Sequence, residues 1–276
     1  MEEPKRILYV SSEVFPYMPE SDISTVGRFL PQGVQELGKE IRAFMPRYGL
    51  INERRNQLHE VIRLSGMNIV IDGSDRPLVI KVSSISSARM QVYFIDNEDY
   101  FHRKAVDSGA DGKFFDDNDE RAIFFARGVL ETVKKLRWKP DIIHCQGWMS
   151  SLVPAFVKNF YHNDPIFTDA KVVVSLYNDR LAEKFDGRFS EKLTGEGLSS
   201  EDAGLLAEPD GINLAKLAVR YSDGIICGVP ELNVELASYA AQLNVPVCPY
   251  EKISQEDTEY IQKYNQFYDK ILGDNE

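Results

Sequence analysis

The sequence is poor in cysteine. It holds three among 276 residues, Cys145, Cys227 and Cys248, and no two of them form a CxxC pair. A zinc site or a disulfide framework needs more cysteines at closer spacing, so we expect no metal site and no disulfides. A sparse and odd number of cysteines is typical of a reducing compartment, and we therefore expect a cytoplasmic protein.

Basic residues and long apolar runs are also scarce. The chain has 32 Lys and Arg against 43 Asp and Glu, a formal net charge of −11. Phosphate contacts need clustered Lys and Arg, so this balance argues against binding to nucleic acid or to an anionic membrane. No run of 18 apolar residues occurs, and we expect no membrane-spanning helix. The first six residues lead directly into a strand pattern, without the apolar stretch of a signal peptide.

What the chain does contain is an alternation of strand and helix patterns along its length. Apolar runs predict strands at residues 7–14, 40–46, 139–144, 171–176 and 222–228. Helical spacing of apolar residues predicts helices at residues 25–37, 121–135, 148–160, 211–221 and 232–243. This alternation predicts an α/β fold with a single Rossmann-like, doubly wound, mainly parallel sheet, and we expect residues 1–276 to form one domain.

Three further strand-like segments lie close together with no helix between them. Residues 68–71 and 78–83 flank the turn Asp72-Gly-Ser-Asp75, and residues 90–95 follow. This spacing predicts a small antiparallel insert on the mainly parallel sheet. Asp117-Asn-Asp119 provides candidate caps for the helix at 121–135.

Three segments leave open questions. Residues 96–120 and 178–211 show no clear period, and we expect irregular loops there, the longer one either functional or disordered. The tail at residues 255–272 places Tyr and Phe on one helical stripe. That stripe either packs on the same domain, which we expect, or docks a partner.

Four segments, taken in order, resemble one known family. They are Ile7-Leu-Tyr-Val-Ser-Ser-Glu-Val-Phe-Pro16, Phe44-Met-Pro-Arg-Tyr-Gly49, Asp117-Asn-Asp-Glu-Arg-Ala-Ile-Phe-Phe125, and Pro140-Asp-Ile-Ile-His144 with Trp148 and Leu152-Val-Pro-Ala155. Their order and spacing are similar to the N-terminal catalytic domain of bacterial glycogen and starch synthases. The resemblance implies a retaining glycosyltransferase of the two-Rossmann-domain type, which elongates an α-1,4-glucan from ADP-glucose.

The loop after the first strand departs from that family. The family carries Lys-Thr-Gly-Gly-Leu, in which the lysine meets the nucleotide-sugar phosphate and the glycines allow close approach of the backbone. This chain has Pro19, Glu20, Ser21 and Asp22 at those positions. Proline removes a backbone donor as well as the cation. Each carboxylate about 4 Å from a diphosphate charge would cost about 1 kcal/mol in water and more in a cleft.

Two other strand ends and the length depart as well. The family reads His-x-His-Asp-Trp where this chain has His144-Cys-Gln-Gly-Trp148, so Gln146 and Gly147 replace a histidine and a carboxylate. Glutamine cannot act as an acid or a base. Tyr177 stands where the family has the histidine before Asn178. The family also has a second Rossmann domain that binds most of the nucleotide, and we expect this chain to lack it.

Four residues are candidates for sugar or anion contacts, each with a structural alternative. Glu13 follows the first strand and could face a sugar or lie in a solvated loop. Arg47 could meet an anion or form a surface ion pair. His144 and Asn178 end strands and match family positions near the reacting sugar, and a hydrogen-bonded structural role is the alternative for His144.

Other chemistry-bearing residues are expected to be structural. Trp148 opens an apolar helix and favours the core over a sugar-stacking face. The acidic run at residues 116–120 lacks the glycine and terminal glutamate of a calcium loop, so helix capping and solvation are expected. Cys145 is expected to pack in a buried strand. We therefore predict no metal and no cofactor.

These departures favour a degenerate, non-catalytic relative that binds α-glucan or a partner such as a full-length synthase. The alternative is an active or split ADP-glucose:1,4-α-glucan glucosyltransferase. A third hypothesis keeps nucleotide-sugar binding without the transfer reaction.

Overall fold

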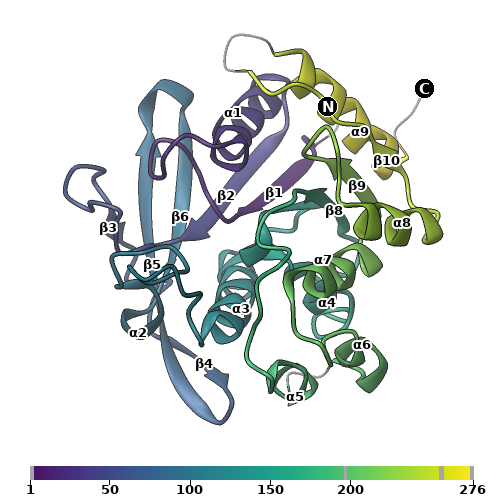
Figure 1. The fold of residues 1–276 in the computed structure, drawn as a ribbon. Coiled ribbons are helices and arrows are strands. Elements are labelled where there is room, and N and C mark those ends of the chain that lie inside the picture. The colour runs from purple at the N-terminus through teal and green to yellow at the C-terminus, as the bar shows by residue number, and fades with distance from the viewer. Residues whose placement is uncertain (1–2, 196–197, 255–257, 274–276) are drawn as a thin grey trace.

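The computed structural model describes residues 3–195, 198–254 and 258–273 (Figure 1). Its centre is one mixed sheet with the strand order β10-β9-β8-β7-β1-β2-β6-β5-β3, and β4 pairs with β5 outside this path. The pairs from β10 through β6 are all parallel. The predicted doubly wound, mainly parallel sheet is confirmed.

The parallel strands are short and nearly all buried, as their unbroken apolar runs predict. Their bounds are β1 Arg6–Ser11, β2 Glu40–Pro46, β6 Met90–Asp96, β7 Ile142–Gln146, β8 Lys171–Leu176, β9 Gly224–Cys227 and β10 Val247–Cys248.

The predicted antiparallel insert is also present, and it forms the far edge of the sheet. It consists of β3 (His59–Glu60), β4 (Met67–Ile71) and β5 (Ser74–Ile85). β4 and β5 are joined by the two-residue turn Asp72-Gly73, where φ is 47° and 74°. Positive φ at both turn residues is the conformation that Asp-Gly favours, which is why this dipeptide places the hairpin.

Helices cover both faces of the sheet (Figure 1). The nine α-helices within the described residues are α1 Asp22–Glu36, α2 Glu98–Phe101, α3 Asn118–Leu136, α4 Val153–Lys158, α5 Phe189–Gly195, α6 Ser200–Gly204, α7 Gly211–Arg220, α8 Val234–Gln242 and α9 Glu259–Leu272. Two 3-10 turns, η1 (Ser86–Ala88) and η2 (Trp148–Ser150), accompany them. α1 and α9 pack together on one face, and α3, α4 and α7 form a contiguous layer on the other.

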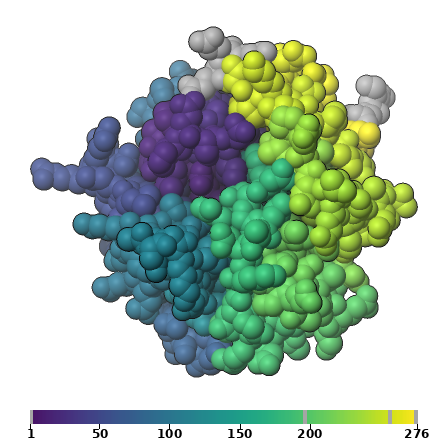
Figure 2. Space-filling model, in the orientation of Figure 1, coloured from purple at the N-terminus to yellow at the C-terminus, as the bar shows by residue number. Residues whose placement is uncertain are grey.

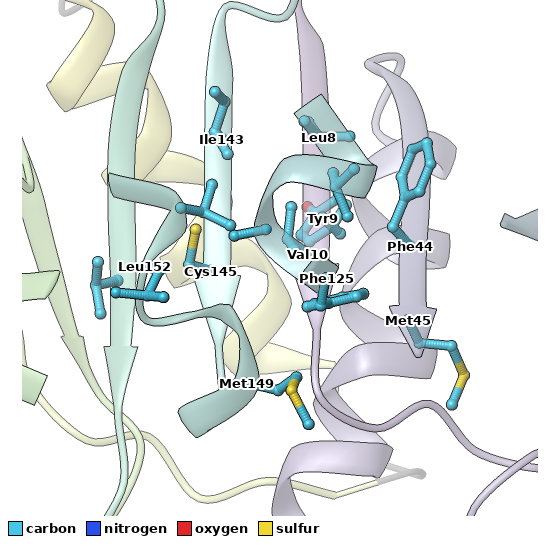
Figure 3. Close-up of a cluster of buried hydrophobic side chains, with 14 of the residues drawn as sticks. Leu8, Tyr9, Val10, Phe44, Met45, Phe125, Ile143, Cys145, Met149 and Leu152 are labelled. Atoms are coloured by element: carbon cyan, nitrogen blue, oxygen red, sulfur yellow. The ribbon is translucent and has the colours of Figure 1, made fainter. Parts of the chain in front are cut away.

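The main core lies between β1, β2 and β7 and the α3 layer. Figure 3 shows Leu8 and Val10 of β1 beside Ile143 of β7 and Phe44 of β2, with Phe125 of α3 beside them. These side chains are fully removed from solvent. Burial of this kind contributes about 1.5–3 kcal/mol for each large apolar side chain.

Several sequence-based element boundaries are corrected by the structure. Residues 178–211 are not one irregular loop, because they contain α5 and α6. Residues 96–120 contain the short helix α2. The segment predicted as one helix at 148–160 is a 3-10 turn followed by α4. None of the helices in the described ranges is long and apolar enough to cross a membrane.

The C-terminal stripe packs on the same fold, as expected. Tyr260, Tyr264 and Tyr268 of α9 are almost fully buried. α9 lies against α1 so closely that a Cβ on Gly33 would come within 2.6 Å of Ile261 Cγ2. Figure 2 shows the N-terminal residues directly beside this C-terminal segment on the surface. Residues 255–257 of the predicted tail lie outside the described ranges.

Replacing Phe267 tests whether α9 is part of the cooperative core. Phe267 is 6% exposed, and its ring lies against Gly224 of β9. We expect Phe267→Ala to lower the free energy of unfolding by about 3 kcal/mol, through lost burial and the cavity left behind. Urea unfolding followed by circular dichroism measures this. Ile62→Ala is the matched control, since Ile62 is 83% exposed and its change should stay within about 0.5 kcal/mol. Equal effects would show that α9 is not integral to the fold.

Candidate functional site

The candidate site lies where the winding of the sheet reverses. β1 is flanked by β2 on one side and β7 on the other, and α1 covers the opposite face from α3 and α4. Ligands of open α/β sheets bind outside the carboxyl ends of the strands at such a switch point. The loops that follow β1, β7 and β8 therefore form what we term the carboxyl-edge site, represented by Glu13, Ser21, Gln146, Gly147 and Asp179.

The loop after β1 caps its own helix. Ser21 is the N-cap of α1: its Oγ accepts the Ser24 N–H, and the Ser24 Oγ accepts the Ser21 N–H, which forms a capping box. The Ser24 hydroxyl also donates to the Pro19 carbonyl at 2.8 Å. α1 therefore begins at Asp22, earlier than the predicted Thr25. Two of the four residues that depart from the family motif are thus used to start the helix.

A carboxylate of the chain itself lies at the start of α1. The Ser21 hydroxyl donates to Glu13 Oε2 at 2.7 Å, and Asp22 lies in the first turn. The N-terminus of a helix attracts anions because its free N–H groups and its dipole both favour negative charge. In this chain Glu13 and Asp22 supply that negative charge from within the protein.

The end of β7 is held by buried hydrogen bonds. Gln146 Nε2 donates to Ser11 Oγ at 2.8 Å, and the Ser11 hydroxyl donates to the Glu13 carbonyl at 2.6 Å. The Gln146 Oε1 atom is buried without a hydrogen-bond partner. A Cβ on Gly27 would come within 2.4 Å of the Glu13 carbonyl oxygen. Only a glycine at this position therefore allows α1 to lie so close to this network. Through Ser11, Gln146 therefore helps to hold the backbone of the loop after β1 in place.

Gly147 adopts a backbone conformation that other residues avoid. Its φ is 78° and its ψ is 156°, and a Cβ would lie 2.4 Å from Ser12 Oγ. Ser12 cannot easily give way, because its Oγ accepts the Met149 N–H at 3.0 Å and its own N–H donates to the Gln146 carbonyl. An aspartate, which the resemblance implies at this position, does not fit this backbone.

The end of β8 is filled by Tyr177. Its side chain is buried against Gly228, where a Cβ would come within 2.5 Å of the tyrosine ring. Burial raises the pKa of Tyr177 well above its usual value, so the phenol stays neutral. The cavity between the ends of β7 and β8 measures about 30 Å³, which is room for only about two water molecules.

Asn178 ties two loops together. Its side-chain amide donates to the Glu231 carbonyl at 2.8 Å, and its Oδ1 accepts the Asn233 N–H at 2.8 Å. The residue is exposed. It therefore fixes the segment before α8 while remaining at the surface.

Sequence reasoning missed an acidic group beside these residues. Asp107 is buried and pairs with Arg180 Nε at 2.8 Å, and Asp179 lies 3.8 Å from the same nitrogen. Burial raises the pKa of Asp179 to about 6 against the lowering effect of Arg180, and the charges of Glu13 and Asp107 raise it further. Tyr48, which is buried with no partner for its hydroxyl, feels the same three carboxylates. The only sequence signal for Asp179 and Arg180 was their position, soon after the end of a strand.

His144 and Arg47 take the structural alternatives. His144 is fully buried, and its ring nitrogens lie 2.7 Å from Ser175 Oγ and 2.7 Å from the Tyr268 hydroxyl. Burial lowers the pKa of His144 to about 3, so the ring is neutral at physiological pH. Arg47 forms ion pairs with Glu53 and, at 4.0 Å, with Asp96, but its side chain is only 12% exposed, so these pairs are not at the surface as the alternative had it. The His144 imidazole and the Arg47 guanidinium are therefore both engaged by other side chains of the protein.

The remaining candidates are mostly structural, with two corrections. Trp148 is 6% exposed and Cys145 is buried, as expected. Asp117 sits at the start of α3 without a capping bond, and its carboxylate pairs with Arg103 instead. Asp119 is not solvated: it is 0% exposed and pairs with Lys192 of α5 at 2.7 Å. No group of three or more His, Cys, Asp or Glu within the described ranges is arranged to hold a metal ion.

Comparison with known proteins decides the family. A model of the starch synthase catalytic domain matches residues 6–244. The chain belongs to the starch synthase catalytic domain family. Glycogen synthase of Chlorobium phaeobacteroides is 37% identical over 222 residues, which cover 79% of this chain and 44% of that protein. Glycogen synthase of Chlorobaculum parvum is 36% identical over 238 residues, which cover 84% and 47%.

A solved structure agrees on the fold. The catalytic domain of starch synthase IV from Arabidopsis thaliana, bound to ADP and acarbose, superimposes with a TM-score of 0.67 at 18% identity. The match covers 88% of this chain and 50% of that one. This member of the starch synthase family thus spans about half the length of the curated relatives it matches.

Substitution of Gly147 tests the backbone constraint. We expect Gly147→Ala to destabilise the protein by about 2–4 kcal/mol, because strain at positive φ adds to the overlap with Ser12. Thermal and urea unfolding measure the loss. Gly187→Ala is the control, since nothing lies within 4 Å of its added Cβ. A change at Gly147 no larger than at Gly187 would contradict the assigned geometry.

The raised pKa of Asp179 predicts a pH-dependent contribution to stability. The folded state holds this proton more tightly than the unfolded state, whose value is 3.8, so stability is lost as the pH rises from about 4 to about 6. For a carboxylate fully removed from water, this rise in pKa would correspond to about 3 kcal/mol of stability. Because the side chain is 29% exposed, we expect about 1 kcal/mol.

Asp179→Asn removes this titration. The stability of the variant relative to the native chain should therefore rise by about 1 kcal/mol between pH 4 and pH 7 in parallel urea titrations. Asp75→Asn, at the exposed hairpin, is the control and should show no such rise. Parallel pH profiles for Asp179→Asn and the native chain would refute the assignment.

Proposed function

We propose that this chain is a non-catalytic relative of the glycogen and starch synthases that binds α-glucan or a partner synthase. The observation that carries the proposal is the start of α1. A nucleotide diphosphate needs positive charge and open backbone N–H groups there. The chain instead has a closed capping box, with the Glu13 carboxylate 2.7 Å from Ser21 Oγ and Asp22 in the first turn.

The surrounding charges support the same reading. Asp107 and Asp179 add negative charge at the same edge, and Arg180 pairs with both. Arg47 is engaged by Glu53 and Asp96. A diphosphate would therefore meet several carboxylates and would have to break existing ion pairs to gain a cation, each like charge costing about 1 kcal/mol or more.

The groups at this edge suit sugar hydroxyls better than phosphates. Glu13 and Asp179 can accept hydrogen bonds from hydroxyl groups. The exposed Asn178 has a second amide N–H and a second oxygen lone pair besides those bonded to Glu231 and Asn233. The matched starch synthase IV domain was solved with acarbose as well as ADP. Contact with the carbohydrate can therefore persist in this chain where contact with the nucleotide is lost.

The alternative is a glucosyltransferase, active in itself or as part of a split enzyme. Its support is the name of the relatives, which are called glycogen synthases and are about twice as long as the matched region. That function would transfer glucose from ADP-glucose to a 1,4-α-glucan.

Two binding measurements separate these functions. We expect the purified chain to co-sediment with glycogen, or with a purified full-length glycogen synthase, in a saturable manner. Calorimetric titration with ADP-glucose to about 1 mM should give no heat, which means binding weaker than about −4 kcal/mol. Glucose transfer from labelled ADP-glucose to glycogen should be absent. Glucose transfer, or micromolar binding of ADP-glucose, would establish the alternative. Absence of all binding would refute both proposed functions.

A matched variant locates the glucan contact. Asp179→Asn keeps the shape of the side chain and removes its charge, so retention on glycogen should fall about threefold or more if the carboxyl-edge site is used. Asp75→Asn, on the exposed hairpin, should leave retention unchanged. Equal retention of both variants would place the contact elsewhere.

A further inference from the structure

A second pocket lies at the opposite edge of the sheet. It measures about 420 Å³, within the usual range for small-molecule sites. The amino ends of β2 and β6 and the end of the antiparallel β5 meet there, since β6 lies between the other two strands (Figure 1). We term it the amino-edge pocket; its lining is Gln35, Glu40, Ile41, Arg42, Ser84, Ile85, Ser86, Arg89, Met90, Gln91 and Tyr93.

Arg42 is held in place by aromatic rings. Its guanidinium carbon lies 5.2 Å from the ring centre of Trp138 and 5.8 Å from that of Tyr93. Nη1 donates to the Tyr93 hydroxyl at 2.7 Å, and buried Nε has no partner. No carboxylate of the described ranges lies within ion-pair distance of Arg42. A planar, pre-oriented guanidinium whose charge is not directly paired suits bidentate contact with phosphate.

Arg89 adds a second positive charge to the same pocket. It ends η1 with a left-handed φ of 50° and is exposed. Within the part of the chain that the structure describes, no carboxylate pairs with Arg89. The exposed Ser84, Ser86 and Gln91 line the pocket beside it. Their hydroxyl and amide groups can hydrogen-bond phosphate oxygens or sugar hydroxyls.

The single carboxylate of the lining, Glu40, lies near the positive side chains of Arg6 and Arg42. Burial acts to raise the pKa of Glu40, but hydrogen bonds from Trp138 and Arg6 and the charges of Arg6 and Arg42 lower it overall. Glu40 Oε2 accepts from Arg6 Nε at 3.0 Å, and Glu40 Oε1 accepts from Trp138 Nε1 at 2.6 Å. The pocket therefore carries a local positive excess, formed by Arg42 and Arg89, on a chain whose net charge is −11. The carboxyl-edge site has the opposite sign, with several carboxylates in place of unpaired arginines.

We propose that the amino-edge pocket binds a phosphomonoester, such as a sugar phosphate, through Arg42 and Arg89. The two arginines supply the charge, and the neighbouring serines and glutamine supply hydrogen bonds to the remainder of the ligand. The site is at the opposite end of the parallel strands from the carboxyl-edge site. It does not depend on the function proposed above.

Calorimetric titrations of the full chain at low ionic strength test the proposal. The probes are inorganic phosphate, glucose 1-phosphate and glucose. We expect both phosphates to bind with a Kd of about 1 mM or tighter, and glucose alone not to bind with that affinity. Equal affinity for the two phosphates supports recognition of phosphate alone, and tighter glucose 1-phosphate adds contact with the sugar. Glucose that binds as well as glucose 1-phosphate, or phosphates that do not bind, would overturn the proposal.

Variants assign the binding to the pocket. Arg89→Gln should weaken phosphate binding about fivefold or more, and Arg42→Lys, which keeps the charge and loses the planar fork, should weaken it by a similar factor. Arg63→Gln removes the same charge from another exposed position and should change affinity less than twofold. Unfolding curves confirm that each variant is folded. Equal losses for Arg89→Gln and Arg63→Gln would show general electrostatics in place of a site.

Discussion

Parallel pairing of β1 between β2 and β7 is the constraint on which the rest of the structure depends. Ile7 and Leu8 lie beside Ile41 and Arg42 on one side and beside Ile142 and Ile143 on the other. Because these strands run the same way, all their carboxyl ends reach one edge and all their amino ends the other. Glu13, Gln146 and Tyr177 meet at the first edge for this reason alone.

Electrostatics at the two edges have opposite sign. At the carboxyl edge, the negative charges of Glu13 and Asp22 lie at the positive end of the α1 dipole. The capping box of Ser21 and Ser24 already hydrogen-bonds backbone N–H groups that a phosphate would use. At the amino edge Arg42 lies against Trp138 and Tyr93 with no direct counter-ion among the described residues. The fold of the starch synthase family is kept, and the two ends of its parallel strands carry charge of opposite sign.

Much of the fold was predictable, because burial repeats along the sequence. The apolar runs at β1, β7 and β8 fix buried parallel strands, and Asp72-Gly73 fixes a hairpin turn through its backbone preferences. α5 and α6 were missed because long-range contacts stabilise them: Lys192 of α5 reaches the fully buried Asp119 of α3. A pair separated by 73 positions in the chain leaves no local period to detect.

For the candidate site, the sequence by itself determined which groups stand at the strand ends and that Pro19, Glu20 and Asp22 supply no cation. Tertiary structure decided what those groups contact. It placed Glu13 at the cap of α1, enclosed His144 between Ser175 and Tyr268, and brought Asp107 to Arg180. The physical reason is that charge and hydrogen-bonding capacity belong to each residue type. Their partners and burial depend on segments that meet only when β1, β7 and β8 form one sheet.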